Sequence, residues 1–151
     1  MDDVMIMSET EVSPLPEEKR VLLVDYFQRA VGAGEEEPYF EMVVYALDDG
    51  SLIMERYADG GTPEQTVTTY DVPAEVYDRA LEIIRKRGLE DWNKLEDYQS
   101  LDGVIFVIRY YDGEKHLRVS SEKMPGNGLE AFREIKALLL EYTAPQYWHI
   151  V

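Results

Sequence analysis

Residues 101–142, LDGVIFVIRYYDGEKHLRVSSEKMPGNGLEAFREIKALLLEY, decide the fold of this chain. Residues 104–111, VIFVIRYY, are nearly all β-branched or aromatic, and such a run predicts a strand that is buried on both faces. Residues 115–121 alternate between polar and apolar side chains, as a second strand would. Asp112-Gly113 can adopt the positive dihedral angles that a hairpin turn requires. We therefore expect an antiparallel pair in which residues 104–111 lie nearer the centre of the sheet.

A helix is predicted directly after this hairpin. Pro125 and Gly126 interrupt the second strand, and Asn127, with Glu130 three residues later, resembles a capping box at a helix N-terminus. Pro145 marks where the helix must already have ended. Between these limits, apolar side chains recur every three or four residues and share one stripe of the helix: Leu129, Phe132, Ile135, Leu139 and Tyr142. We expect that stripe to cover one face of the sheet.

The same order of elements occurs earlier in the chain. Residues 39–47 and 51–57 predict two strands joined through the turn Asp48-Asp49-Gly50, and residues 65–70 have the composition of an edge strand. Residues 73–87 predict an amphipathic helix. The face of the first strand that we expect to meet a helix carries Phe40, Met42, Val44 and Ala46. The predicted fold class is α+β, with an antiparallel sheet of about five to six strands and two helices packed on one face.

The ends of the chain differ from its centre. Residues 1–18 are acidic and contain two prolines, so we expect a flexible acidic arm followed by a single domain over residues 19–151. Residues 19–31 fit either a helix or a strand, and their β-branched and aromatic content favours a strand over residues 20–27. The segment after Pro145 is apolar. We expect it to pack on its own domain, with contact to a partner as the alternative.

Composition excludes several classes of protein. The 151 residues include no Cys, which excludes a disulfide framework, a thiolate nucleophile and a Cys-based metal site. No stretch reaches the roughly 18 apolar residues of a membrane-spanning helix. The first residues are acidic and do not resemble a secretory signal. We therefore expect a soluble, cytoplasmic protein.

Charge is unevenly distributed. The chain carries a net charge of −16, of which residues 1–71 hold −13 and residues 72–151 hold −3. An acidic protein repels nucleic acid and anionic membranes, so we expect neither to bind directly. The asymmetry is compatible with a basic protein partner at the N-terminal half, although an acidic surface usually serves solubility alone.

Four short motifs stand out in the order of the chain: Gly88-Leu89 followed by Trp92, Leu101-Asp102-Gly103, Tyr111-Asp112-Gly113, and Met124-Pro125-Gly126-Asn127. Together they resemble a group of small bacterial domains of uncharacterised function, found in Gram-positive gut bacteria as cytoplasmic or membrane-anchored proteins. In that group the segment before the last helix commonly reads Ser-Gly, a few residues, then Pro and Asn, whereas Ser120-Ser121 here lacks the Gly. The resemblance spans residues 20–142 and implies the order of strands and helix, including a strand over residues 20–27. It implies no activity.

Residue types that carry catalysis are sparse. The two histidines, His116 and His149, have neither an HxxxH nor an HExxH spacing, so we expect no His-based metal site. Asp97, Asp102 and Asp112 could pair, but among 31 acidic residues chance adjacency is expected.

Loop motifs of known chemistry are missing as well. The turns at Asp48-Asp49-Gly50 and Asp112-Gly113 lack the oxygen ligands of a calcium loop. Nucleophile-elbow and phosphate-loop patterns do not occur. We therefore expect no enzyme and no cofactor.

Two functions remain as hypotheses. The first is a binding or interaction domain of unknown specificity, which uses its sheet face or the region of Trp92 and Asn127. The second is an inhibitor whose acidic N-terminal half imitates nucleic-acid phosphates and occupies a basic groove. A third, enzymatic option would need two carboxylates that face each other in a concave pocket. The candidate binding residues are Glu35, Glu36, Glu37, Asp48, Asp49, Trp92 and Asn127.

Overall fold

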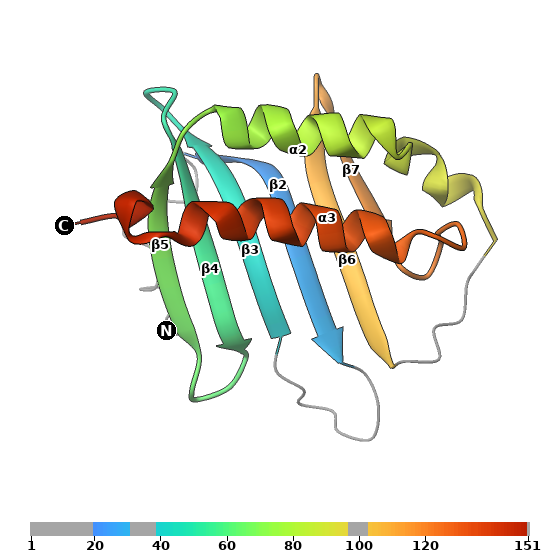
Figure 1. Ribbon diagram of the computed structural model, residues 1–151, viewed down its shortest axis with the longest axis horizontal. Coiled ribbons are helices and arrows are strands. Elements are labelled where there is room, and N and C mark those ends of the chain that lie inside the picture. The colour runs from blue at the N-terminus through green and yellow to red at the C-terminus, as the bar shows by residue number, and fades with distance from the viewer. Residues whose placement is uncertain (1–19, 31–38, 97–102, 151) are drawn as a thin grey trace, which may run out of the picture.

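The computed structural model describes residues 20–30, 39–96 and 103–150. Its six strands are β2 (Arg20–Ala30), β3 (Tyr39–Leu47), β4 (Leu52–Gly60), β5 (Thr66–Val72), β6 (Val104–Asp112) and β7 (Lys115–Ser120). Its two main helices are α2 (Glu75–Lys86) and α3 (Leu129–Leu140), and short 3₁₀ turns form η3 (Leu89–Lys94), η4 (Glu141–Thr143) and η5 (Pro145–Tyr147). The α+β class predicted from the sequence is confirmed, as are its two helices on one face (Figure 1).

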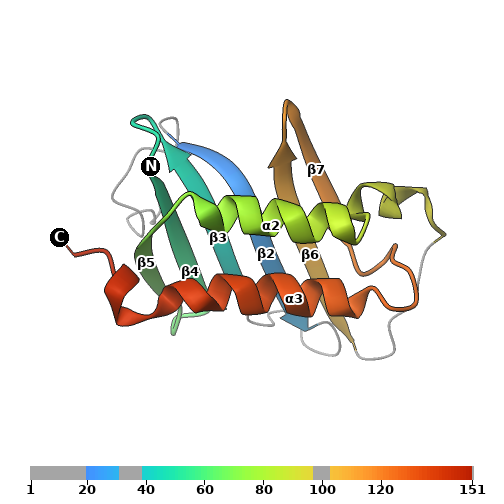
Figure 2. The same ribbon diagram turned by 45° about the horizontal axis from the view of Figure 1, so that its top comes forward.

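The strands form one antiparallel sheet in the order β5-β4-β3-β2-β6-β7. The first four strands are consecutive hairpins, and the second hairpin, β6–β7, adds to the free side of β2. As expected, residues 104–111 lie nearer the centre than residues 115–121, and β5 is an edge strand. The two helices lie side by side across the same face in both views (Figures 1 and 2). We call the other face of the sheet the helix-free face.

The core lies between the sheet and the helices because alternate strand residues point toward them. β3 contributes Met42 and Val44, both fully buried, as the apolar face predicted for this strand requires. α3 contributes Phe132, whose ring packs against Phe106 of β6 and against Trp92 of η3. Trp92 is 3% exposed and fills one end of the core, as predicted.

β2 settles the ambiguity over residues 19–31 in favour of a strand. It extends to Ala30, beyond the residues 20–27 predicted, and pairs with β3 on one side and β6 on the other. The register with β3 shifts between Leu22 and Val24, as at a β-bulge. Beyond the bulge, Val24 and Tyr26 face the helices while Asp25 and Phe27 face the opposite way.

Three local predictions need correction. α3 begins at Leu129 after Gly128, and no side chain caps its first turn, so the capping box expected of Asn127 and Glu130 does not form. The β6–β7 turn is centred on Gly113 and Glu114, because Asp112 still pairs with Lys115. Only the first of these central residues has a positive φ, which fits a type II′ turn.

The third correction concerns β6. Its helix-free face is only partly buried, since Val107 is covered but Arg109 is 48% exposed at its side chain. A strand that is apolar on one face and carries a single charge on the other is half-buried, and this charge proves to be the centre of the candidate site.

The end of the chain packs on its own domain. Trp148 forms an isolated antiparallel bridge with Tyr70 of β5, and the backbone N–H of His149 donates to the carbonyl of Thr69 over 3.1 Å. The Trp148 side chain is 55% exposed, so the contact is made mainly by the backbone. None of the helices in the described part of the chain is long and apolar enough to cross a membrane.

Candidate functional site

Charged side chains form a row across the helix-free face of the sheet. The antiparallel register places residues of five neighbouring strands directly opposite one another: Glu55, Val43, Asp25, Arg109 and Arg118. Side chains on the same face of paired strands lie about 5 Å apart at their Cβ atoms. The row therefore brings an acid, an apolar residue, a second acid and two arginines into line.

Asp25 and Arg109 are the closest ion pair in this row. The Arg109 guanidinium lies with Nε 2.7 Å and Nη2 2.6 Å from the same oxygen, Oδ2, of Asp25. The Asp25 side chain is 1% exposed, whereas the Arg109 side chain extends over it and remains about half exposed. Burial of an unpaired carboxylate at this depth is costly, and Arg109 supplies the opposite charge that offsets this cost.

Glu41 completes the cluster from β3. Its carboxyl group lies 3.5 Å from Arg109 Nη2 and beside the Asp25 carboxyl. Burial is the main cause that raises the pKa of Glu41 to about 9, and the neighbouring Asp25 raises it further than Arg109 lowers it. A pKa in this range keeps Glu41 protonated at neutral pH. Asp25 Oδ1 is a buried oxygen that has no hydrogen-bond partner among the described residues.

A cavity of about 370 Å³ opens beside this cluster, and we call it the sheet-face cavity. Its described lining comprises Asp25, Phe27, Tyr39, Glu41, Val107, Arg109 and Arg118. The rings of Phe27 and Tyr39 pack with their centroids 5.2 Å apart and form an aromatic wall. The cavity thus combines an apolar wall with a few convergent charged groups, as small-molecule sites do.

A second buried ion pair lies on the same face of the sheet. Arg20 Nη1 is 3.2 Å from Glu55 Oε2, and both side chains are almost fully buried. The Arg20 guanidinium also lies 4.3 Å from the ring centre of Tyr45, and Tyr57 donates to Glu55 over 3.1 Å. The charges of Arg20 and Glu55 offset each other within the face itself. None of the four residues lines the sheet-face cavity.

The region predicted around Trp92 and Asn127 is also hollow. Both residues line a separate cavity of about 370 Å³ with Pro125, Gly128, Ala131, Lys86 and Arg87, which we call the Trp92 cavity. Trp92 and Asn127, which the sequence analysis placed in one candidate region, thus do line one cavity. The two cations are already engaged, since Glu134 of α3 lies 2.7 Å from Arg87 Nε and 3.3 Å from Lys86 Nζ. These pairs hold α2 against α3.

Asp48 and Asp49, the two acidic candidates within the described residues, line neither cavity. Asp49 lies in the β3–β4 turn, where it accepts hydrogen bonds from the hydroxyl and the backbone N–H of Ser51, and these bonds lower its pKa. Asp48 is exposed in the same turn. Glu35, Glu36 and Glu37 lie outside the described residues.

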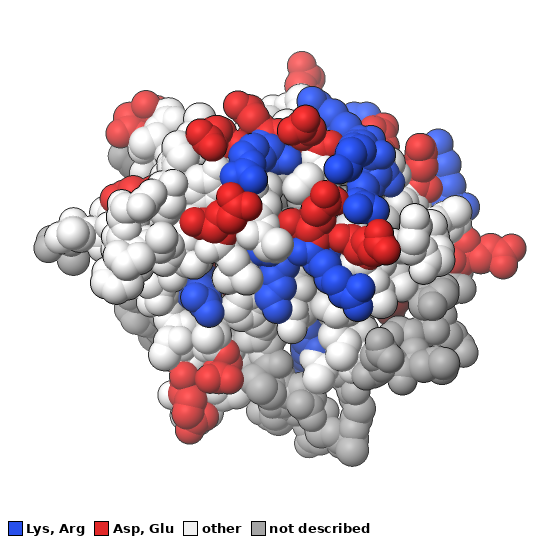
Figure 3. All heavy atoms as spheres, viewed as in Figure 1, with Lys and Arg blue, Asp and Glu red and all other residues white. Residues whose placement is uncertain are grey.

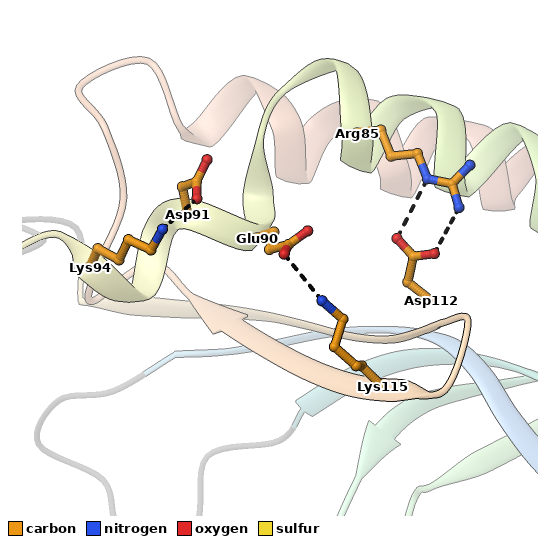
Figure 4. Close-up of polar contacts among 6 residues, drawn as sticks. All are labelled: Arg85, Glu90, Asp91, Lys94, Asp112 and Lys115. Atoms are coloured by element: carbon orange, nitrogen blue, oxygen red, sulfur yellow. Dashed lines mark hydrogen bonds and ion pairs between the residues drawn. The ribbon is translucent and has the colours of Figure 1, made fainter.

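The other carboxylates considered from the sequence have structural partners where they are described. Asp112 accepts from Arg85 of α2 over 2.7 Å, and this bond lowers the pKa of the carboxyl (Figure 4). Glu90 of η3 pairs with Lys115 of β7 over 3.3 Å in the same region. Asp97 and Asp102 lie outside the described residues.

The two histidines lie apart from each other and from the cavities. His149 Nδ1 lies 2.9 Å from Asp71, and the His116 ring packs beside Tyr111. Within the described ranges, no group of three or more His, Asp or Glu side chains could hold a metal ion.

Sequence reasoning did not select Asp25, Glu41 or Arg109 as site residues. A signal existed, because Asp25 is the lone charge in VLLVDYF and Arg109 the lone charge in VIFVIRYY. An isolated charge within a strongly apolar strand requires a partner if it is buried. The pairing of the two strands, which lie 84 residues apart at this point, could not be read from either segment alone.

No protein-family model matches this chain, and no curated protein matches it either. The geometry of the site is therefore what carries the functional argument.

Proposed function

We propose that this protein is a non-catalytic binding domain that holds a small ligand in the sheet-face cavity. The observation that carries the proposal is the placing of Asp25, Glu41 and Arg109 beside a cavity that also has an aromatic wall. Buried charges contribute little net stability compared with well-packed apolar residues. Ionisable groups with shifted pKa values beside a cavity are, by contrast, a common property of functional sites.

The same cluster argues against catalysis by its two acids. Both Arg109 nitrogens that contact Asp25 bind the same oxygen, Oδ2, and the raised pKa of Glu41 keeps that acid protonated at neutral pH. Two guanidinium contacts make Asp25 Oδ2 a weak base, and a protonated Glu41 cannot act as a nucleophile. The seven described lining residues include no His, Ser, Thr, Lys or Cys.

The charge pattern on the helix-bearing face does not resemble that of an inhibitor that imitates phosphates. On the helix-bearing face, Asp and Glu side chains are interleaved with Lys and Arg (Figure 3). Several of them form pairs, such as Arg79 with Glu141 and Arg87 with Glu134. A phosphate mimic would instead need an exposed row of uncompensated carboxylates facing a basic groove.

The test is a fragment-library titration of the ¹⁵N-labelled full chain, followed by chemical-shift mapping. We expect shifts to cluster on the strands that line the sheet-face cavity, namely β2, β3, β6 and β7. Val107→Trp should fill the cavity and abolish those shifts. Val67→Trp, on β5 at the far edge of the same face, is the matched control and should leave them unchanged.

Shifts confined to the surroundings of Trp92 and Asn127 would overturn the proposal, and so would the absence of any fragment that binds. A circular-dichroism melt of each variant shows whether it is folded. If Val107→Trp unfolds, Val107→Phe takes its place, with Val67→Phe as its control.

A further inference from the structure

We propose that Arg118, with Arg109 opposite to it, binds the carboxylate group of a small ligand whose planar apolar part lies against the rings of Phe27 and Tyr39. This inference rests on the proposed function and names the chemical class of the ligand. It follows from the charges around the sheet-face cavity, where Arg109 is paired with an acid and Arg118 is not.

The first observation is that two arginines stand directly opposite each other. Arg109 of β6 and Arg118 of β7 are register partners in the antiparallel sheet. Like charges at directly opposite positions destabilise a sheet. Ser120, which lies two residues after Arg118 in β7 and on the same face, shows that this face of the strand accommodates an uncharged side chain.

The second observation is that only one of these arginines is compensated. Arg109 is paired with Asp25 and lies near Glu41. Within the described residues, the Arg118 guanidinium forms no ion pair. The Asn93 side chain donates a hydrogen bond to the backbone carbonyl of Arg118, not to its guanidinium. Arg118 therefore brings an uncompensated positive charge to the lining of the cavity.

Among the described lining residues, the charge balance thus differs in sign from that of the whole protein. With Glu41 protonated, Asp25 cancels one arginine and the other remains, although the chain as a whole carries −16. A guanidinium presents N–H donors in a fork that matches the two oxygens of a carboxylate. Arg109 contributes as well, because its contacts with Asp25 and Glu41 use Nε and Nη2 and do not use Nη1.

The remaining lining sets the size and shape of the ligand. A volume of about 370 Å³ lies near the lower end of the roughly 300–1,000 Å³ typical of ligand pockets. Phe27, Tyr39 and Val107 supply apolar surface, and the two rings offer a stacking partner for a planar group. An aromatic acid of about the size of benzoate fits both requirements. Inorganic phosphate would satisfy the arginines but would leave the aromatic wall unused.

The experiment titrates the ¹⁵N-labelled full chain separately with benzoate, benzyl alcohol, benzylamine and inorganic phosphate. We expect benzoate to bind most tightly of the four and to shift the amide resonances around Arg109 and Arg118. Arg118→Gln should weaken benzoate binding at least about tenfold, since a charge-assisted contact is lost. Arg133→Gln removes the same charge from the exposed side of α3 and should leave the affinity unchanged.

Three outcomes would overturn the inference. Benzylamine binding as tightly as benzoate would show that the cavity does not select a negative charge. Phosphate binding as tightly as benzoate would show that the aromatic wall is not used. An unchanged benzoate affinity in Arg118→Gln would show that Arg118 does not bind the carboxylate. If library fragments of another class bind in the cavity while benzoate does not, this inference fails alone; if nothing binds there, the proposed function fails with it.

Discussion

Asp25 of β2 and Arg109 of β6 are register partners in the sheet, and the Arg109 guanidinium extends over a carboxylate that is 1% exposed. The pair joins the N-terminal meander β2–β5 to the C-terminal hairpin β6–β7 at the strand boundary between them. It is therefore part of the fold and part of the candidate site at the same time. This double role makes its removal informative.

Arg109→Met should destabilise the protein strongly. The substitution keeps most of the apolar stem but leaves Asp25 as an uncompensated buried acid, so we expect the free energy of unfolding to fall by about 3 kcal/mol. Urea unfolding monitored by tryptophan fluorescence measures this change. The double variant Asp25→Leu/Arg109→Met should recover most of the loss because no charge is left buried. A loss under about 1 kcal/mol in the single variant would contradict the account.

Stability should depend on pH through Glu41. Its folded-state pKa is raised from 4.5 to about 9, so between these values the folded state holds a proton that the unfolded state has released. The contribution of Glu41 to stability is complete below about pH 4.5 and is lost as the pH rises through 9. Between these values, the free energy of unfolding should fall by about 1.4 kcal/mol per pH unit.

Glu41→Gln should flatten that slope, because Gln has nearly the same shape as Glu but cannot ionise. Urea midpoints measured from pH 5 to pH 9 test this. Glu64→Gln, at an exposed position between β4 and β5, is the control and should keep the wild-type slope. Parallel pH profiles for wild type and Glu41→Gln would show that Glu41 does not hold the proton.

Phe132→Ala should lower the free energy of unfolding by about 3–5 kcal/mol. The Phe132 side chain is 1% exposed, and its ring contacts both Trp92 and Phe106, so truncation leaves a cavity between α3, η3 and β6. Leu95→Ala, at a residue that is 39% exposed, should cost less than about 1 kcal/mol. Equal effects in the two variants, measured by chemical denaturation, would place Phe132 outside the core.

Two glycines provide a matched test of backbone conformation. Gly88 follows the C-cap of α2 with φ of 66°, and a methyl group added there would meet nothing within 4 Å. Gly88→Ala should therefore cost about 1–2 kcal/mol through the left-handed conformation alone. Gly126 has the same free space without a positive φ, so Gly126→Ala should be neutral or slightly stabilising. The difference between their melting temperatures isolates the conformational contribution.

The elements could be predicted from the sequence because each depends on local periodicity. The apolar alternation of β3 and the stripe of α3 identified the faces that meet in the core. The predicted cap of α3 was wrong. Asn127 and Glu130 have the residue types and spacing of a capping box, but the helix begins after Gly128. Spacing alone does not determine which residue a side chain bonds.

The site was harder to predict because it depends on register between distant strands. Trp92 and Asn127 were selected, and they do line a common cavity. Asp25, Glu41 and Arg109 come from three strands, and their proximity exists only once β6 has paired with β2. A one-residue shift in that pairing would move Arg109 to the face that meets the helices.

The most direct measurement is a crystal structure of the protein soaked with benzoate. The account predicts benzoate in the sheet-face cavity, with its carboxylate on Arg118 and its ring against Phe27 and Tyr39. Benzoate bound only in the Trp92 cavity, or a sheet-face cavity that stays empty at saturating concentration, would contradict it.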